Sequence, residues 1–319
     1  MNSKLVLGID TSNYKTSVAV IDREQKIVCD IRNFLKVKQG EKGLRQSDAL
    51  FQHVKNLPNL IESACEISKE PFAAVAYSSK PRPVEGSYMP VFLAGESFAR
   101  SIGASMNIPI YGFSHQEGHI EAIKAYSDFK EEKEFLACHF SGGTSELLKV
   151  TTLDEGYQID IIGGSKDIAF GQVIDRVGVT LGMEFPAGEE MDSIALSTSE
   201  STRLLSPIKV KEAWLNLSGI DTQVKRLLES NDNINTDSLI KEIFEKTSDV
   251  MFKMIVQGVE KTGLNKLIMA GGVSSSEYIR QNISDRLSKE GIMITFSDNG
   301  LSQDNAVGTA LLGGKAIWR

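Results

Sequence analysis

Two of the four histidines in the chain, His115 and His119, lie four positions apart in the segment GFSHQEGHIEA, residues 112–122. Ser114 before them and Glu117 form a capping-box sequence, which predicts that a helix begins at His115. Residues four apart are about 40° apart around a helix, so both imidazoles can reach one metal ion. They can equally be two histidines that share a helix face without binding anything. The spacing alone does not decide between the two.

A third ligand would favour the metal interpretation, and Asp304 in the segment SQDNAVGTA, residues 302–310, is the candidate. The segment predicts the start of a helix, where an acidic side chain can also be explained as an N-terminal cap. If that helix packs beside the histidine helix, His115, His119 and Asp304 form a set of two histidines and one carboxylate. Such a set leaves coordination positions open and suits iron or zinc.

Two glycine-rich segments indicate places where the backbone can closely approach a phosphate or a ribose. HFSGGTSELL places Ser141, Gly142 and Gly143 at a turn between two predicted strands, although a plain hairpin explains this turn equally well. IMAGGVSSSEYIR places Gly271 and Gly272 between a buried strand and a helix, which suits a nucleotide near a helix N-terminus. Neither segment is a Walker loop or a GxGxxG fingerprint, and each is weak evidence alone.

The elements that must position these residues follow a repeated plan. The chain opens with a strand, a turn and a strand (KLVLGID, TSNY and KTSVAVID), and a similar pattern restarts near residue 134. Between them, SDALFQHVKNLPNLIESACEI predicts a helix with Ser47 as its N-cap. The duplication predicts an α/β fold of two ribonuclease-H-like lobes, the plan of the actin-like ATPase superfamily, with nucleotide in an interlobe cleft. The expected lobes are residues 1–133, completed by a helix over about 303–319, and residues 134–302.

The composition is that of a globular protein large enough for two domains. The chain has 319 residues, 41% hydrophobic and 24% charged, and it lacks an apolar run of the roughly 20 residues that a membrane span needs. We expect no signal peptide, and the three scattered cysteines predict a reducing, cytoplasmic location without a disulfide framework. The net charge of −7 argues against indiscriminate nucleic-acid binding, but it leaves open RNA recognised through a local patch or with a partner's help.

An ordered set of motifs resembles one known family. The chain contains, in order, GIDTS, HQEGH, FSGGTSEL, DIAFGQVIDRVGVTLGMEFPAG, LNLSG, MAGGVSSS and QDNAVGTA. Together they look like the universal tRNA threonylcarbamoyltransferases, called TsaD in bacteria and formerly O-sialoglycoprotein endopeptidases. The resemblance runs from Gly8 to Gly314, and it is most specific in the histidine pair combined with Asp304.

The resemblance implies transfer of a threonylcarbamoyl group from an adenylate donor to the exocyclic amine of the adenosine next to a tRNA anticodon. It implies that iron or zinc, held by His115, His119 and Asp304, acts as a Lewis acid on the donor. An adenine nucleotide (ATP or the acyl-adenylate) is the expected ligand, tRNA the expected acceptor, and proteins similar to TsaB and TsaE the expected partners, in a homo- or heterodimer. The remaining expected site residues are catalytic Asp10, Ser12 and Lys15, and nucleotide-binding His139, Phe140, Ser141, Gly142, Gly143, Asp175, Gly188, Asp192, Gly271, Gly272 and Ser276.

Departures from the family pattern indicate a divergent paralogue. GIDTSNYKT stands where the family usually has GIETSCDET, so Tyr14 and Lys15 replace an expected acidic pair. Thr144 replaces the histidine of SGGHT, Ser276 replaces an asparagine, and KPRPVEG, residues 80–86, replaces GPGLVG. An acidic pair could position the acceptor amine or a second cation, whereas Lys15 would neutralise phosphate charge.

Two explanations of these departures stay open: the acceptor differs, or a partner subunit supplies the missing carboxylate. Because three separate segments have changed, a different acceptor is the favoured explanation. The acceptor would then be a small molecule or a protein in place of tRNA. A non-catalytic scaffold is disfavoured because all three metal ligands are present. A zinc protease is disfavoured because Gln116 stands where such enzymes carry the glutamate that acts as base.

Overall fold

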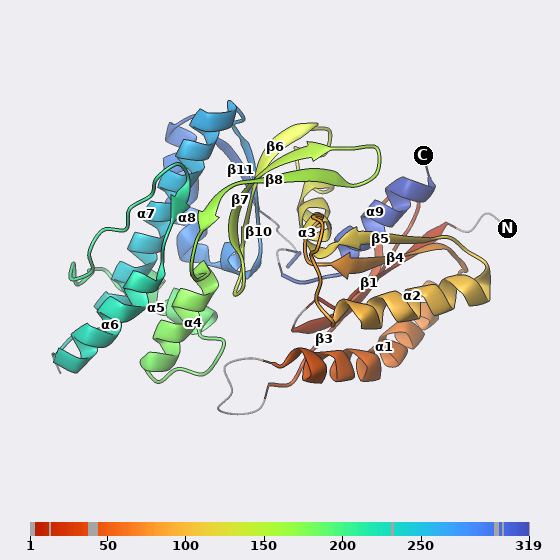
Figure 1. Ribbon diagram of the computed structural model, residues 1–319, viewed down its shortest axis with the longest axis horizontal. Helices are drawn as coiled ribbons and strands as arrows, with labels where there is room; N and C mark the ends of the chain where they lie inside the picture. The colour runs from red at the N-terminus through yellow and green to blue at the C-terminus, as the bar shows by residue number, and fades with distance from the viewer. Residues whose placement is uncertain are drawn as a thin grey trace. The chain divides into compact units, whose positions relative to one another are not determined.

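The computed structural model describes residues 4–12, 14–37, 44–230, 233–296, 300–301 and 303–318. The chain forms two compact units, whose elements are labelled in Figure 1. Unit 1 comprises residues 1–133, 151–158 and 297–319, and unit 2 comprises residues 134–150 and 159–296. The chain therefore leaves unit 1 after residue 133, returns to it for one hairpin turn, and ends in it.

Unit 1 is built on a sheet of five described strands in the order β3-β2-β1-β4-β5. β1 pairs antiparallel with β2 and parallel with β4, and β4 pairs parallel with β5. The first two strands are the predicted pair, although Asn13 in the turn between them lies outside the described residues. Because β1, β4 and β5 run parallel, their C-terminal ends meet at one edge of the sheet, where ligands bind in such folds. The bounds are β1 (Leu5–Asp10), β2 (Lys15–Ile21), β3 (Ile27–Phe34), β4 (Phe72–Lys80) and β5 (Ile110–Ser114).

Helices cover both faces of this sheet. α1 (Gln46–Ser68) and α2 (Phe92–Met106) lie on one face, and their buried side chains form a core with β1 (Figure 1). On the other face α9 (Val307–Ile317) packs against β1, β2 and β4, and α3 (His115–Lys124) packs against α9. The N-cap predicted for α1 is wrong. The helix begins at Gln46 after Arg45, so Ser47 lies inside its first turn.

Unit 2 is built on six described strands in the order β11-β10-β6-β7-β8-β9. Like unit 1 it opens with a strand, a turn and a strand, as the repeated pattern predicts, and β6, β10 and β11 run parallel. The strands are β6 (Glu134–Phe140), β7 (Ser145–Thr152), β8 (Tyr157–Ser165), β9 (Trp214–Leu215), β10 (Lys266–Ala270) and β11 (Met293–Phe296). The helices are α4 (Phe170–Thr180), α5 (Gly188–Ser197), α6 (Ser218–Ser230), α7 (Thr236–Thr262), η1 (Gly272–Ser275) and α8 (Glu277–Lys289).

α7 is a long amphipathic helix that contributes much of the core of unit 2. Its 27 residues place Ile243, Met251 and Ile255 in the core and charged residues on the opposite side. Asn235 caps the N-terminus of the helix, because its side-chain oxygen accepts a hydrogen bond from the Ser238 amide. Charged positions of this kind are unsuited to a lipid environment. No helix within the described ranges is both long and apolar enough to cross a membrane.

Candidate functional site

The start of α3 is fixed by the capping box that the sequence predicts. The Ser114 hydroxyl accepts from the Glu117 amide at 3.2 Å, and the Glu117 carboxylate accepts from the Ser114 amide at 2.7 Å. The reciprocal pair satisfies two backbone donors that a helix N-terminus otherwise leaves unpaired. α3 therefore begins at His115, and its first turn carries both histidines.

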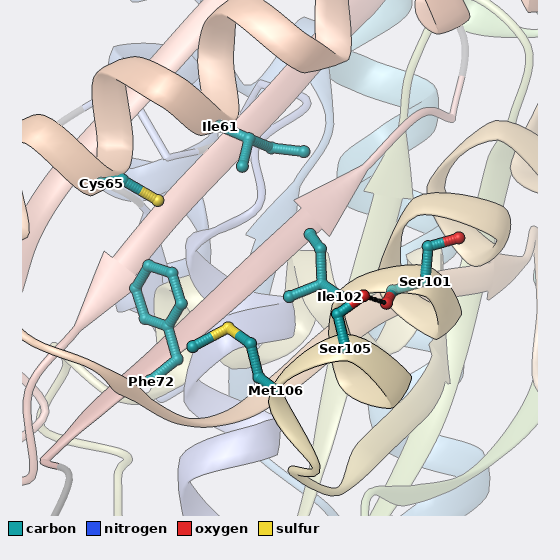
Figure 2. A pocket seen from close by; sticks show the side chains of 7 residues that line it. All are labelled: Ile61, Cys65, Phe72, Ser101, Ile102, Ser105 and Met106. Carbon is teal, nitrogen blue, oxygen red and sulfur yellow. Dashed lines mark hydrogen bonds between the residues drawn. The ribbon is translucent and has the colours of Figure 1, made fainter.

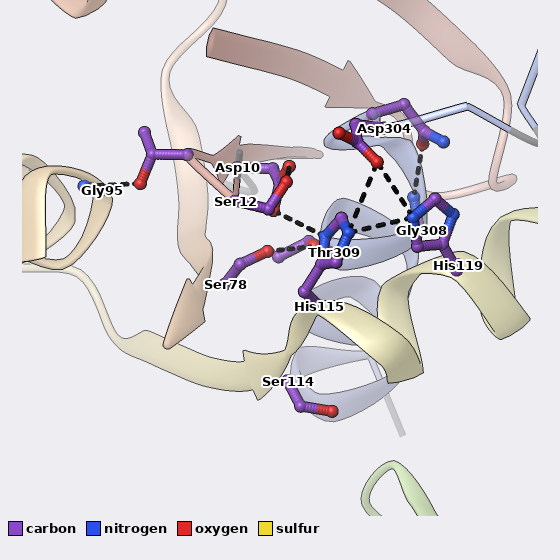
Figure 3. Close-up of polar contacts among 12 residues, drawn as sticks. Asp10, Ser12, Ser78, Gly95, Ser114, His115, His119, Asp304, Gly308 and Thr309 are labelled. Carbon is purple, nitrogen blue, oxygen red and sulfur yellow. Dashed lines mark hydrogen bonds and ion pairs between the residues drawn. The ribbon is translucent and has the colours of Figure 1, made fainter. Parts of the chain in front are cut away.

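His115, His119 and Asp304 converge at one point of unit 1 (Figure 3). The two Nε2 atoms lie 2.9 Å apart, and Asp304 Oδ1 lies 3.2 Å from His119 Nε2 and 3.5 Å from His115 Nε2. Bonds of about 2.0–2.2 Å to one ion separate neighbouring donor atoms by about 2.8–3.1 Å in an octahedral site and about 3.3–3.6 Å in a tetrahedral site. The three atoms thus fit one metal ion. Among the described residues, no other group of three histidine, cysteine or acidic side chains comes this close.

A close contact between two helices brings Asp304 to the histidines. α3 packs against α9 where Gly308 faces Gly118, so closely that a Cβ on Gly308 would lie 1.8 Å from the Gly118 carbonyl oxygen. The same Cβ would lie 2.9 Å from the amide nitrogen of Ala122. Only glycine fits such a crossing. Because α9 begins at Val307, three residues after Asp304, this packing helps to set the distance from the carboxylate to His119.

The capping role that the sequence left open for Asp304 belongs to the next residue. Asn305 Oδ1 accepts from the amides of Val307 at 3.0 Å and Gly308 at 3.4 Å, which are the first donors of α9. The Asn305 side-chain amide also donates to the carbonyls of Leu301 and Gln303, at 2.9 and 2.8 Å. Asn305 therefore caps the helix and closes the preceding turn. The Asp304 carboxylate is left to face the histidines.

Acidic groups on either side control the protonation of the histidines. Burial lowers the pKa of His115, but the carboxylates of Asp10 and Asp304 outweigh it and raise that pKa to about 10. Burial, together with the neighbouring His115, lowers the pKa of His119. Burial raises the pKa of Asp304, but hydrogen bonds from both histidines hold it well below its usual range. The neighbouring carboxylates therefore favour the protonated form of His115.

Asp10 and Lys15, two of the expected catalytic residues, lie at the end of β1 and the start of β2, next to the turn that joins the two strands. Asp10 is fully buried, with one oxygen 3.1 Å from His115 Nδ1 and the other accepting from the Ser12 hydroxyl at 2.7 Å. Lys15 is 6% exposed, and its ammonium group donates to Gln303 Oε1 and lies 4.5 Å from the centre of the Phe34 ring. Burial lowers the pKa of Lys15, partly offset by the charge of Asp304.

The loop between β6 and β7 in unit 2 carries three of the expected nucleotide-binding residues, Ser141, Gly142 and Gly143. The Ser141 hydroxyl accepts from the amides of Gly143 at 3.2 Å and Thr144 at 3.0 Å. A Cβ added at Gly142 or Gly143 would meet nothing within 4 Å. Before the loop, Phe140 is a core residue whose ring lies 5.0 Å from that of Phe170. His139 is buried as well.

The other expected nucleotide residues take part in the structure of unit 2. Gly271 has a φ of 91°, and a Cβ there would lie 2.3 Å from the Phe140 carbonyl oxygen, so the turn into η1 itself requires glycine. Ser276 caps α8 by accepting from the Ile279 amide at 3.1 Å, and it donates to Asp192 at 2.5 Å.

Asp192 also accepts from the Glu277 amide at 2.8 Å, so it lies at the N-terminus of α8. Asp175 accepts from the Ala187 amide at 3.0 Å, which fixes the turn that leads into α5 at Gly188. Burial raises the pKa of Asp175. A Cβ added at Gly188 or Gly272 would meet nothing within 4 Å, so both positions have open space.

Sequence reasoning missed the residues that support α3 and the metal ligands from outside. Glu121, on the face of α3 away from the histidines, pairs with Lys315 at 2.7 Å and accepts from the Tyr157 hydroxyl. Glu117 also accepts from the Tyr157 amide at 3.1 Å, in addition to its part in the capping box. For Asn305 the signal was present, because Asp-Asn before a predicted helix offers two candidate caps.

A separate cavity of about 280 Å³ in unit 1 lies between α1 and α2 (Figure 2). Its lining is mainly apolar, with Ile61, Phe72, Ile102 and Met106 among the seven residues drawn. The hydrogen bond drawn there joins the Ser105 hydroxyl to the Ser101 carbonyl, at 2.8 Å within α2. None of the predicted site residues lines it. The cavity is therefore separate from the group formed by His115, His119 and Asp304.

Comparison with known proteins places these features in a family. The model of the TsaD family, described as tRNA N6-adenosine threonylcarbamoyltransferase, matches residues 33–311. A tRNA N6-adenosine threonylcarbamoyltransferase of Neorickettsia sennetsu is 27% identical, with 100% of this chain and 94% of that protein aligned.

Solved structures with the same fold are more distant in sequence. Component A of the (R)-2-hydroxyglutaryl-CoA dehydratase of Acidaminococcus fermentans aligns with a TM-score of 0.60 at 14% identity, over 99% of this chain and 100% of that chain. Full-length HypF in its phosphate- and nucleotide-bound form aligns with a TM-score of 0.65 at 12% identity, over 99% of this chain and 47% of that chain. At such identities the likeness concerns the fold alone. It confirms the predicted α/β fold.

Proposed function

The chain belongs to the TsaD family of tRNA N6-adenosine threonylcarbamoyltransferases, and we propose that it transfers a threonylcarbamoyl group from an adenylate donor to tRNA with one bound metal ion. The convergence of His115 Nε2, His119 Nε2 and Asp304 Oδ1 within 4.8 Å carries the metal part of this proposal. Two imidazoles and one carboxylate suit iron or zinc and leave positions open for the donor. When bound there, the ion supplies Lewis-acid stabilisation of the negative charge that develops on the donor.

The Ser141–Gly143 loop is proposed to hold the phosphate of the adenylate. The amides of Gly143 and Thr144 already point at one oxygen, the Ser141 hydroxyl, and a phosphate oxygen can accept from the same two donors. Open space at Gly142 and Gly143 allows the ligand to approach the backbone. The nucleotide sugar is assigned to the turn held by Asp175 and Gly188.

Replacing Gly142 by Val is expected to weaken ATP or AMP binding at least tenfold. A Cβ at Gly142 would meet no protein atom within 4 Å, so we expect the fold to tolerate valine, while a phosphate approaching the amides would meet its side chain. Isothermal calorimetry measures the affinity, and Gly219→Val, whose Cβ meets only Gln223 Nε2 at 3.9 Å, is the matched control. Equal affinity in wild type and a folded Gly142→Val variant would rule out this phosphate position.

Metal binding at pH 7.5 is expected to release about one proton per ion. Coordination needs the lone pair of His115 Nε2, and with its pKa raised to about 10 the metal-free imidazole is still protonated at pH 7.5. The release should fall to zero as pH rises through 10, and below that pH the affinity should rise about tenfold per unit. Zinc titration by calorimetry in two buffers of different ionisation enthalpy measures the proton count. Uptake of zinc without proton release at pH 7.5 would contradict this protonation state.

tRNA is favoured over a different acceptor because one departure from the family pattern has an internal explanation. Lys15 donates to Gln303 inside unit 1, so its presence is no evidence for a changed acceptor. The alternative, carbamoylation of a small molecule or a protein, depends on the other departures, at Tyr14, Thr144, Ser276 and residues 80–86. That loop lies beside the histidines, since the Pro81 carbonyl accepts from the Gln116 amide at 3.1 Å.

An in vitro assay decides between the acceptors. Purified protein, synthetic threonylcarbamoyl-adenylate, unmodified tRNA and proteins similar to TsaB and TsaE are expected to yield threonylcarbamoyladenosine, detected by mass spectrometry of the nucleosides. Omitting the partner proteins tests whether the chain depends on them. Absence of product, while the protein still binds metal and nucleotide, would favour the alternative acceptor.

A further inference from the structure

The β1–β2 hairpin touches both elements that carry the proposed metal ligands. β1 ends at Asp10 and β2 begins at Lys15, and the two strands are paired from Asp10 and Ser17 onwards. Asp10 contacts His115 at the start of α3. Lys15 contacts Gln303, the residue before Asp304. These paired strands therefore contact both the histidine helix and the segment that carries Asp304.

The Lys15 ammonium group makes its contacts with other side chains of unit 1. It donates to Gln303 Oε1, it lies 4.5 Å from the centre of the Phe34 ring, and the residue is only 6% exposed. A cation over an aromatic ring and in a hydrogen bond is held in one place. The Gln303 carbonyl also accepts from the Asn305 side chain at 2.8 Å. The two residues on either side of Asp304, Gln303 and Asn305, are therefore both held by hydrogen bonds.

Asp10 is similarly placed behind the histidine. Its carboxylate is fully buried, and its two oxygens contact His115 Nδ1 at 3.1 Å and the Ser12 hydroxyl at 2.7 Å. A carboxylate on Nδ1 accepts the N–H there, which leaves the Nε2 lone pair of the same ring for a metal. In Figure 3 Asp10 and Ser12 lie on the side of His115 away from Asp304 and His119.

We propose that Asp10 and Lys15 are positioning residues of the metal site, with Asp10 orienting His115 and Lys15 holding the segment of Asp304 through Gln303. This inference rests on the proposed function, because it presumes that the three ligands bind an ion. It gives Lys15 a role that differs from contact with the donor phosphate. If Lys15 positions the metal site, its removal should lower metal affinity and leave nucleotide affinity unchanged. If Lys15 contacts the donor phosphate, its removal should lower nucleotide affinity.

Gln303→Leu tests the Lys15 contact without changing any charge. Gln303 is exposed, so the variant should fold, but the ammonium group loses its acceptor and the Asp304 segment loses its anchor. Zinc affinity, measured by competition with a chelator, is expected to fall about 10- to 100-fold, as for other changes behind metal ligands. The visible spectrum of the cobalt-substituted protein should shift as well. Unchanged affinity and spectrum would overturn the role of Lys15.

Lys15→Met, with the exposed Lys26→Met as control, separates positioning from phosphate contact. AMP affinity by calorimetry is expected to equal that of wild type. A tenfold or greater loss of AMP affinity would assign Lys15 to the donor phosphate and overturn the inference. Asp10→Asn is expected to lower zinc affinity about 10- to 100-fold, and an equal affinity would overturn the role of Asp10. If wild type itself binds no zinc or iron, the proposed function fails before these variants are compared.

Discussion

Replacing His119 by Ala is expected to abolish stoichiometric metal binding. His119 Nε2 lies 2.9 Å from His115 Nε2 and 3.2 Å from Asp304 Oδ1, so its removal leaves two donors where three converge. The loss should exceed the roughly 10- to 100-fold that changes behind a ligand cause. Elemental analysis of protein purified without chelator should find about one equivalent of iron or zinc in wild type and a small fraction of it in the variant.

The control for this experiment is another buried histidine of the same unit. His53 lies on α1, with Nδ1 2.9 Å from the Thr16 hydroxyl, and it is no member of the ligand group. His53→Gln should keep the metal equivalent, even if it lowers stability. His115→Ala and Asp304→Ala should behave like the His119 variant. Equal metal content in wild type and all three variants would show that no metal binds here.

Replacing Gly308 by Ala is expected to lower both the stability of the fold and the amount of metal that the protein binds. The added Cβ would lie 1.8 Å from the Gly118 carbonyl oxygen and 2.7 Å from its carbon, and backbone atoms cannot turn aside as a side chain can. α9 must therefore move away from α3, which takes Asp304 away from the histidines. Overpacking of this kind costs about 3 kcal/mol. Urea denaturation should show a lower midpoint, and elemental analysis should show less metal than in wild type.

Gly219→Ala is the matched control, because a Cβ at Gly219 meets only Gln223 Nε2 at 3.9 Å. This change inside α6 should be neutral or slightly stabilising, since alanine favours a helix more than glycine does. A Gly308→Ala protein with the wild-type urea midpoint and a full metal equivalent would contradict the proposed packing of α3 on α9.

The sequence allows local features to be predicted, and the limits appear where distant segments meet. The capping box at Ser114 and Glu117 involves four consecutive residues, so its geometry follows from local chemistry. The contact of Asp304 with His119 depends on how closely α3 and α9 approach, and no spacing in the sequence reveals a crossing at Gly118 and Gly308. For this reason the sequence predicts the group of three metal ligands only on the condition that the C-terminal helix packs beside the histidine helix.

Lys15 shows a second limit. A cationic residue near an expected phosphate is readily interpreted as a phosphate ligand, and only the structure reveals Gln303 as its acceptor. Ser47 shows a third, because serine is a good N-cap but α1 already begins at Gln46. A shift of one or two residues at a helix boundary is small, yet it decides which side chain can accept the first amides.

The division of unit 1 along the chain has a consequence for the order of folding. His119 and Asp304 are 185 residues apart, and the intervening chain includes all of unit 2. Bringing two such distant points together in an unstructured chain costs roughly 5 kcal/mol of entropy. Once unit 2 has folded, β6, which follows its entry, and β11, which precedes its exit, are two strands apart in one sheet, and the effective loop is far shorter. During refolding, α9 should therefore dock late, and the ability to capture a metal ion should appear only after the sheet of unit 2 has formed.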